Sequence, residues 1–107
     1  MTKKKDIKWK FMKVNGVLNR AYKVSNYGDV VHAKTMVPLK QWEMRKKSKT
    51  NGSDYQAVSI PGFKSHLRVH RIVCETFHGA APAGKELVNH KDEFKSNNKA
   101  SNLQWVT

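Results

Sequence analysis

Three residues with metal-binding side chains lie at regular spacing in the second half of the sequence. His70, Cys74 and His78 are four residues apart, so a helix would carry them on one face. Only adjacent pairs of these side chains could chelate one ion. Cys74 is the single cysteine, which excludes an internal disulfide and a four-cysteine zinc site. The spacing alone therefore does not favour a metal centre.

The second chemical feature is a large excess of positive charge. The chain has 21 Lys and Arg against 8 Asp and Glu, a formal net charge of +13. Such an excess is typical of proteins that bind a polyanion, with nucleic acid as the first candidate. Residues 1–50 hold 14 basic and 3 acidic side chains, and residues 51–107 hold 7 and 5. The first half is therefore expected to bind the polyanion; the alternative is a lysine-rich surface that only confers solubility.

Membrane partners are not expected from the sequence. No apolar run approaches the roughly 20 residues that a membrane span requires. No apolar signal-peptide core follows the basic start of the chain. The single cysteine fits a reducing cytoplasm.

The first half of the chain is predicted to form antiparallel strands. In residues 7–14 apolar side chains alternate with lysines, the pattern of a half-buried strand. Asn15-Gly16 is a strong hairpin signal, because both central residues of that turn need positive φ, and residues 17–24 would return. Residues 29–32 are predicted as a third strand and residues 43–51 as a basic loop.

The second half adds one short helix to further strands. Apolar side chains between Val69 and Phe77 recur at helical spacing, which predicts a helix over 70–77 that ends at Gly79. The remaining segments are predicted as strands at 55–60, 63–69, 87–90 and 102–106 and as a polar loop at 91–100. The expected class is α+β, mostly antiparallel strands, in one domain or two very small ones that share a core.

Three stretches of the second half resemble a known family. They are residues 67–77 (LRVHRIVCETF), residues 88–92 (VNHKD) and residues 97–107, which contain a double asparagine and the word SNLQWVT. In this order and spacing they resemble the HNH homing endonucleases of phages and introns. Upstream, Trp9 and residues 22–30 (YKVSNYGDV) resemble the β-rich DNA-binding module that often precedes this nuclease. The resemblance implies a DNA-binding module over 1–60 and an HNH nuclease module over 61–107.

The resemblance assigns chemical roles to two neighbouring residues. His90 falls on the position of the general base, where a neutral imidazole takes a proton from the attacking water. Without that pattern, a lone histidine in a basic protein is more often a surface hydrogen-bond donor. Asn89 falls on a metal-ligand position, although strand alternation would point it away from His90. The implied cofactor is a divalent cation, Mg²⁺ or Mn²⁺, if the protein is active.

Four further residues match structural positions of the motif. Asn102 matches an asparagine whose side chain ties the hairpin loop together through backbone hydrogen bonds. Asn97 and Asn98 would brace the same loop. His70 begins the helix, and its expected role is a hydrogen bond to a nearby carbonyl or phosphate.

The sequence also departs from the family pattern. Asn89 stands where many active members have Asp, and an amide oxygen is a weaker Mg²⁺ ligand than a carboxylate. In the family a further helix supplies an Asn or His that completes the metal site, whereas this sequence ends at Thr107. The ββα-metal motif is therefore expected to be incomplete, truncated after its second hairpin strand. Asp92 belongs to the loop in the family pattern and is not expected to be a ligand.

Cationic side chains are predicted to follow a DNA phosphate backbone, with an affinity that falls steeply with salt. They are Lys8, Lys10, Lys13, Arg20 and Lys23 in the strands, Arg45, Lys46, Lys47 and Lys49 in the basic loop, and Arg68 and Arg71 near the start of the helix. The cationic sheet would present the imidazole of His90 to the DNA.

Two functions of different class follow. The first is a metal-dependent endonuclease of the homing type that nicks or cuts double-stranded DNA. The second is a non-catalytic binder on the same scaffold, either a DNA-binding regulator or a phage-encoded inhibitor that docks on a host nuclease or nucleoprotein complex. A small RNA-binding protein fits the charge but not the motifs. The expected location is the cytoplasm of a bacterial host, with a phage as the source of the gene.

Overall fold

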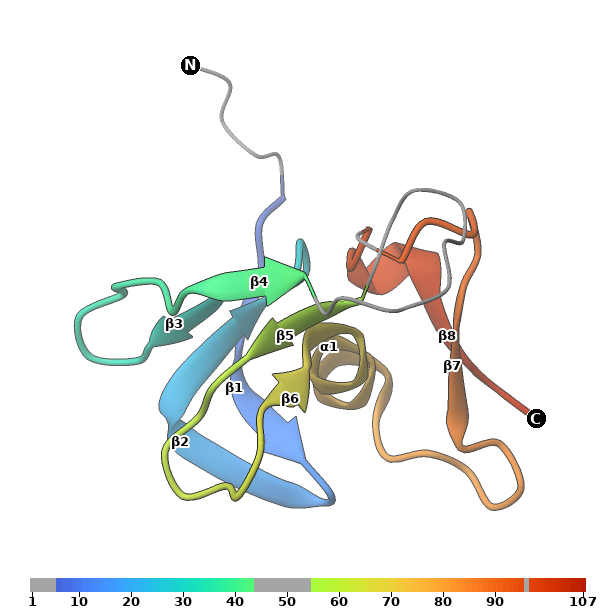
Figure 1. Cartoon of the computed structure of the whole chain (residues 1–107), viewed down its shortest axis with the longest axis horizontal. Coiled ribbons are helices and arrows are strands. Elements are labelled where there is room, and N and C mark those ends of the chain that lie inside the picture. Colours follow the sequence, from blue (N-terminus) through green and yellow to red (C-terminus); the bar gives the residue numbers. More distant parts are fainter. Residues whose placement is uncertain (1–5, 44–54, 96) are drawn as a thin grey trace.

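The computed structural model describes residues 6–43, 55–95 and 97–107. These residues form three small antiparallel sheets and one α-helix, the predicted α+β class. In Figure 1 the helix α1 lies at the centre, with the two three-stranded sheets on one side and a β-hairpin on the other. No helix in the described ranges is both long enough and apolar enough to cross a membrane.

The first sheet has the order β1-β2-β3, and its strands β1 and β2 contain the basic residues Lys10, Lys13, Arg20 and Lys23. Its strands are β1 (Trp9–Val14), β2 (Val17–Ser25) and β3 (Val30–His32). Asn15 and Gly16 connect β1 and β2 with φ values of 52° and 80°, as the hairpin prediction requires. The register shifts between Phe11 and Met12. This irregularity explains why the alternation slips there, and Met12 is completely buried.

The second sheet is built from shorter strands than predicted. It has the order β4-β5-β6, with β4 (Gln41–Glu43), β5 (Gln56–Val58) and β6 (Leu67–Arg68). The predicted strand over 63–69 is wrong for residues 63–66, which follow a turn at Pro61-Gly62 where Phe63 N–H donates to the Ile60 carbonyl. The sequence did not predict β4. Most of the predicted basic loop lies outside the described residues.

The helix α1 (Val69–His78) packs on both halves of the chain. It ends at Gly79, whose φ is 86° and whose N–H donates to the Glu75 carbonyl at 3.0 Å. One core therefore contains side chains from both predicted modules. They are Met12, Tyr22, Val24, Val30, Val58 and Ile60 from the first, and Val69, Ile72, Val73, Cys74, Ala100 and Leu103 from the second.

Polar contacts also join the β1–β2 hairpin to the helix. The buried carboxylate of Glu75 accepts hydrogen bonds from the turn amides of Asn15, at 2.9 Å, and Gly16. Next to it, Thr76 Oγ1 accepts a hydrogen bond from Lys13 N–H at 3.1 Å. The hairpin is thus held at a fixed position against α1.

The last element is the hairpin of β7 (Leu87–His90) and β8 (Leu103–Val106). The two strands pair antiparallel, and a 3₁₀ turn at Ala100–Asn102 precedes β8. Two hydrogen bonds fix the hairpin to its neighbours: Trp105 Nε1 donates to the Gly79 carbonyl, and Ala100 N–H donates to the Asn26 carbonyl, both at 2.9 Å.

Candidate active site

His90 is the last residue of β7 and is buried. The residue is 6% exposed, whereas Asn89 beside it is exposed. The two side chains face opposite sides of the strand, as alternation dictates. The expectation that the imidazole is presented openly to a DNA surface is therefore wrong, because the side of β7 that carries it is packed against other residues.

Aromatic rings surround the imidazole of His90. The ring centroid of His70 lies 5.2 Å away, and that of Tyr55 lies 6.0 Å away. Tyr55 in turn stacks on His70 at 4.7 Å with an interplanar angle of 23°. The helix α1 begins at Val69, one residue before the predicted start at His70. The His70 ring contributes to this cluster of His70, His90 and Tyr55.

Two cations flank the same cluster. Lys95 Nζ lies 4.8 Å from the centroid of the Tyr55 ring, and the Arg68 guanidinium lies 5.5 Å from it. The sequence pattern predicted no functional role for Tyr55 or Lys95. No sequence signal marks them, because a tyrosine at a strand start is typical of core packing and a loop lysine is typical of a solvated surface.

Asn98 makes the direct polar contact with His90. Its Oδ1 lies 3.0 Å from His90 Nε2, and Asn98 is 5% exposed. The neighbouring Asn97 has a different environment, because its side-chain amide donates to Asp92 Oδ2 at 2.7 Å. The sequence predicted that both asparagines brace the loop. In the structure the side chain of Asn97 bonds to Asp92 of the loop, whereas the side chain of Asn98 contacts His90.

The loop after β7 is closed by Asp92 and Asn102. Asn102 Oδ1 accepts a hydrogen bond from Asp92 N–H at 3.1 Å, and its amide group donates to the Asn97 carbonyl at 2.9 Å. Asp92 accepts from the side chains of Asn97 and Asn102 and from Phe94 N–H. The Asn97 side chain, followed by the Phe94 N–H, lowers the pKa of the Asp92 carboxyl. These bonds fix the loop that follows His90.

The described residues offer few ligands for a metal ion. Within residues 6–43, 55–95 and 97–107, no three His, Cys, Asp or Glu side chains lie close enough to hold one. Asn89 presents one neutral amide oxygen, and both carboxylate oxygens of Asp92 already accept hydrogen bonds. Burial raises the pKa of the Cys74 thiol to about 11, so this thiol stays protonated and is a poor ligand. The side chains of the described ranges therefore do not form a complete metal site by themselves.

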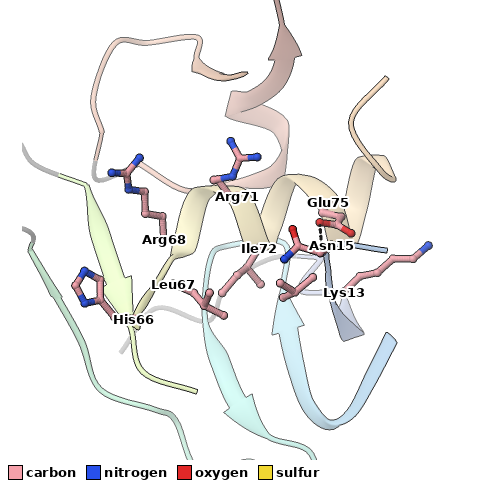
Figure 2. Close-up of a pocket in the computed structure, with 9 residues that line it drawn as sticks. Lys13, Asn15, His66, Leu67, Arg68, Arg71, Ile72 and Glu75 are labelled. Atoms are coloured by element: carbon pink, nitrogen blue, oxygen red, sulfur yellow. Dashed lines mark hydrogen bonds between the residues drawn. The ribbon is translucent and has the colours of Figure 1, made fainter. Parts of the chain in front are cut away.

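A groove lined by cationic side chains opens beside the start of α1 (Figure 2). Lys13, His66, Arg68 and Arg71 line it, together with Asn15 and Glu75. Arg71 is held by a hydrogen bond from Nη1 to the Glu86 carbonyl at 3.0 Å, and its guanidinium lies 5.5 Å from the Trp105 ring. Arg68 belongs to both the groove and the cluster around Tyr55.

The other predicted DNA-binding residues lie elsewhere. Lys10 lies over the Phe77 ring, and Arg20 and Lys23 lie over the Phe11 ring. Lys8 is exposed just before β1. The basic-loop residues Arg45, Lys46, Lys47 and Lys49 lie outside the described residues. The structure thus brings Lys13, Arg68 and Arg71 of the predicted set into one groove.

The second half of the chain, which includes this hairpin, is similar to a known protein family. Residues 67–107 match the family model described as HNH endonuclease. This segment contains α1, the β7–β8 hairpin, His90 and the asparagines of the loop. In this segment the chain is therefore similar to HNH endonucleases.

The individual relatives extend the similarity to the amino-terminal half. An uncharacterized HNH endonuclease of Acanthamoeba polyphaga mimivirus is 32% identical over 111 residues, which cover 100% of this chain and 25% of that protein. A second one from the same virus is 37% identical over 85 residues, which cover 79% of this chain and 24% of that protein. The chain therefore spans about a quarter of the length of these relatives.

A solved structure is also similar. It is a structure of the HNH homing endonuclease I-HmuI, whose description reads "DNA binding and cleavage by the HNH homing endonuclease I-HmuI". The two chains superimpose with a TM-score of 0.65 and are 32% identical in sequence. The match covers 94% of this chain and 52% of that one, so it includes the β-rich first half as well as the HNH segment.

Proposed function

We propose that the protein binds double-stranded DNA and hydrolyses its phosphodiester bonds, as a homing-type HNH endonuclease with His90 as the general base. The main support is the position of His90 in the hairpin of the HNH segment, within a cluster that Arg68 and Lys95 flank. A general base acts on a water molecule that lies beside the phosphate to be cleaved. The positive charges of Arg68 and Lys95 would attract a DNA phosphate to the cluster around His90.

The path of the DNA follows from the cationic groove. Arg68 lines the groove and also lies against Tyr55 of the cluster. A phosphate backbone bound by Lys13 and Arg71 in the groove would therefore continue past Arg68 toward His90. Each phosphate contact adds about 0.9 to the slope of log affinity against log salt. Binding by three groove cations should depend steeply on salt.

A divalent cation, Mg²⁺ or Mn²⁺, is part of the proposal. Asn89 is exposed and would supply one oxygen ligand, with water, phosphate oxygens or residues outside the described ranges as the others. When bound, such an ion withdraws charge from the phosphate. The described residues themselves attract the phosphate, hold the loop and accept the proton at His90.

Plasmid nicking tests the proposal. The protein is incubated with supercoiled plasmid and Mg²⁺ or Mn²⁺, beside His90→Ala and the control His32→Ala, which changes an exposed histidine in β3. Nicking by the wild type and the control, with loss in His90→Ala, is the expected result. Equal nicking by His90→Ala would remove His90 from the mechanism.

A second function is favoured by one observation, the 6% exposure of His90. A recessed base and a neutral Asn89 also suit a DNA binder that does not cleave. In that case no variant nicks the plasmid, while gel retardation persists and weakens with salt. Absence of retardation at low salt would point instead to a protein partner, such as a host nuclease or nucleoprotein complex. A cytoplasmic location and a phage origin stay predictions from the sequence.

A further inference from the structure

We propose that Asn98 is a positioning residue that fixes the tautomer of His90. Its side-chain oxygen would hold the imidazole proton on Nε2 and leave the lone pair of Nδ1 as the proton acceptor. The catalytic consequence rests on the proposed function above. The tautomer itself does not, because it is a property of the folded protein without DNA.

The contact between Asn98 and His90 defines which atom donates and which accepts. Asn98 Oδ1 and His90 Nε2 lie 3.0 Å apart, and both side chains are at least 94% buried. An amide oxygen only accepts hydrogen bonds, so the bond requires the hydrogen on Nε2. In a neutral imidazole the other nitrogen then carries the lone pair. Burial makes the alternative costly, because two acceptors would face each other without water.

The position of Asn98 is set by a turn from the first half of the chain. Gly28 packs directly against it: a Cβ added at Gly28 would lie 3.0 Å from Asn98 Cβ and 3.2 Å from its carbonyl oxygen. Two residues further, Ala100 N–H donates to the Asn26 carbonyl at 2.9 Å. The turn that contains Asn26 and Gly28 therefore packs against Asn98 and limits where its side chain can lie.

Through this turn the first half of the chain supports a residue of the candidate active site. The turn belongs to the segment that resembles a DNA-binding module, yet it supports the residue that contacts the imidazole. The adjacent Asn97 offers a matched comparison, because it has the same side chain and bonds to Asp92 rather than to His90.

Nuclear magnetic resonance of the ¹⁵N-labelled chain tests the proposal without DNA. Long-range ¹H–¹⁵N correlations in mildly alkaline buffer report which nitrogen of His90 carries the proton. The wild type is expected to show the Nε2–H form together with an Nε2 proton that exchanges slowly with water. A wild-type Nδ1–H form would overturn the proposal, because it would mean that the amide group of Asn98 faces the ring.

Three variants separate positioning from simple packing. Asn98→Ala is expected to lose the slowly exchanging Nε2 proton, and Asn98→Asp is expected to keep it, because a carboxylate is also an acceptor. Asn97→Ala should leave the Nε2 proton of His90 in place. An Asn98→Ala spectrum with the wild-type His90 signals would contradict the role of Asn98. If Asn98→Ala does not fold, the wild-type tautomer and Asn98→Asp decide the question.

Plasmid cleavage by the same variants separates the proposed role of Asn98 from the proposed endonuclease function. If the wild type nicks plasmid, Asn98→Ala is expected to lower kcat about 10-fold or more, with little change in KM; removing the hydrogen-bond partner of a metal-ligating histidine costs about 10-fold to 100-fold, and a histidine base depends on its orientation in the same way. If the wild type does not nick plasmid, the endonuclease proposal fails, while the tautomer result still stands or falls on its own spectra.

Discussion

Glu75 is expected to be a main attachment between the β1–β2 hairpin and α1, and Glu75→Gln tests this. In the wild type Glu75 is 9% exposed, and its two carboxylate oxygens accept hydrogen bonds from the turn amides of Asn15 and Gly16. Glutamine has nearly the same shape but keeps only one oxygen. Its NH₂ group would then face a backbone N–H, so one of the two bonds is lost and the other loses its charge.

The magnitude follows from these two bonds. Hydrogen bonds to a charged group contribute about 1.5–3 kcal/mol each, and neutral ones about 1 kcal/mol. Asn15 and Gly16 are exposed, so water can partly satisfy the freed amide. We expect a loss of about 2 kcal/mol in the free energy of unfolding, which corresponds to a fall in Tm of about 10 °C for a domain of this size.

Urea unfolding followed by tryptophan fluorescence measures the effect, since the chain has 3 Trp. Glu86→Gln is the matched control, because it changes an exposed acidic side chain and should alter stability by less than about 0.5 kcal/mol. If Glu75→Gln were as stable as Glu86→Gln, the carboxylate would not hold the hairpin, and the reasoning from its two bonds would be refuted.

Three further predictions concern other parts of the molecule. Asp92 has a lowered pKa in the folded state because of hydrogen bonds from Asn97 and its loop. Its contribution to stability is therefore present above the ordinary carboxyl pKa of about 3.9 and is lost as pH falls through the folded pKa. The stability difference between wild type and Asp92→Asn should shrink as pH falls from about 6 to about 3, and a constant difference in urea titrations would contradict this. Burial raises the Cys74 pKa to about 11, so a thiolate-specific disulfide reagent at about pH 8 should react at least about 10-fold more slowly with folded than with denatured protein; equal rates would show that the thiol is accessible. Gly28→Ala places a Cβ 3.0 Å from the Cβ of Asn98, whereas the Cβ of Gly62→Ala, at a similar φ, meets no atom within 4 Å. Thermal unfolding should show Gly28→Ala as the less stable by about 1–3 kcal/mol, and the reverse order would contradict the close approach.

The sequence predicted the elements whose causes are local. The Asn15-Gly16 turn needs positive φ at both residues and has it. The helix followed from apolar spacing and ended at Gly79 as predicted. The similarity of residues 67–107 to HNH endonucleases was also visible in the sequence, because the short motifs of the second half occur at fixed offsets.

Other elements were missed because their cause is not local. The strand β4 has three residues and exists through its pairing with β5, which no periodicity of so short a segment indicates. The sequence pattern assigned no role to Glu75. Only the packing of the hairpin against α1 makes its carboxylate a buried acceptor for two turn amides.

The candidate site shows the same division between local and tertiary causes. The sequence by itself determined that a histidine stands at position 90 of a hairpin strand and that asparagines follow in its loop. The tertiary structure decided that this imidazole is buried among His70 and Tyr55, and that two adjacent, chemically identical asparagines contact different partners. The physical reason is that burial and hydrogen-bond partners depend on residues brought together from distant parts of the chain. The turn at Gly28, 70 residues from Asn98 along the sequence, sets the position of the side chain that touches His90.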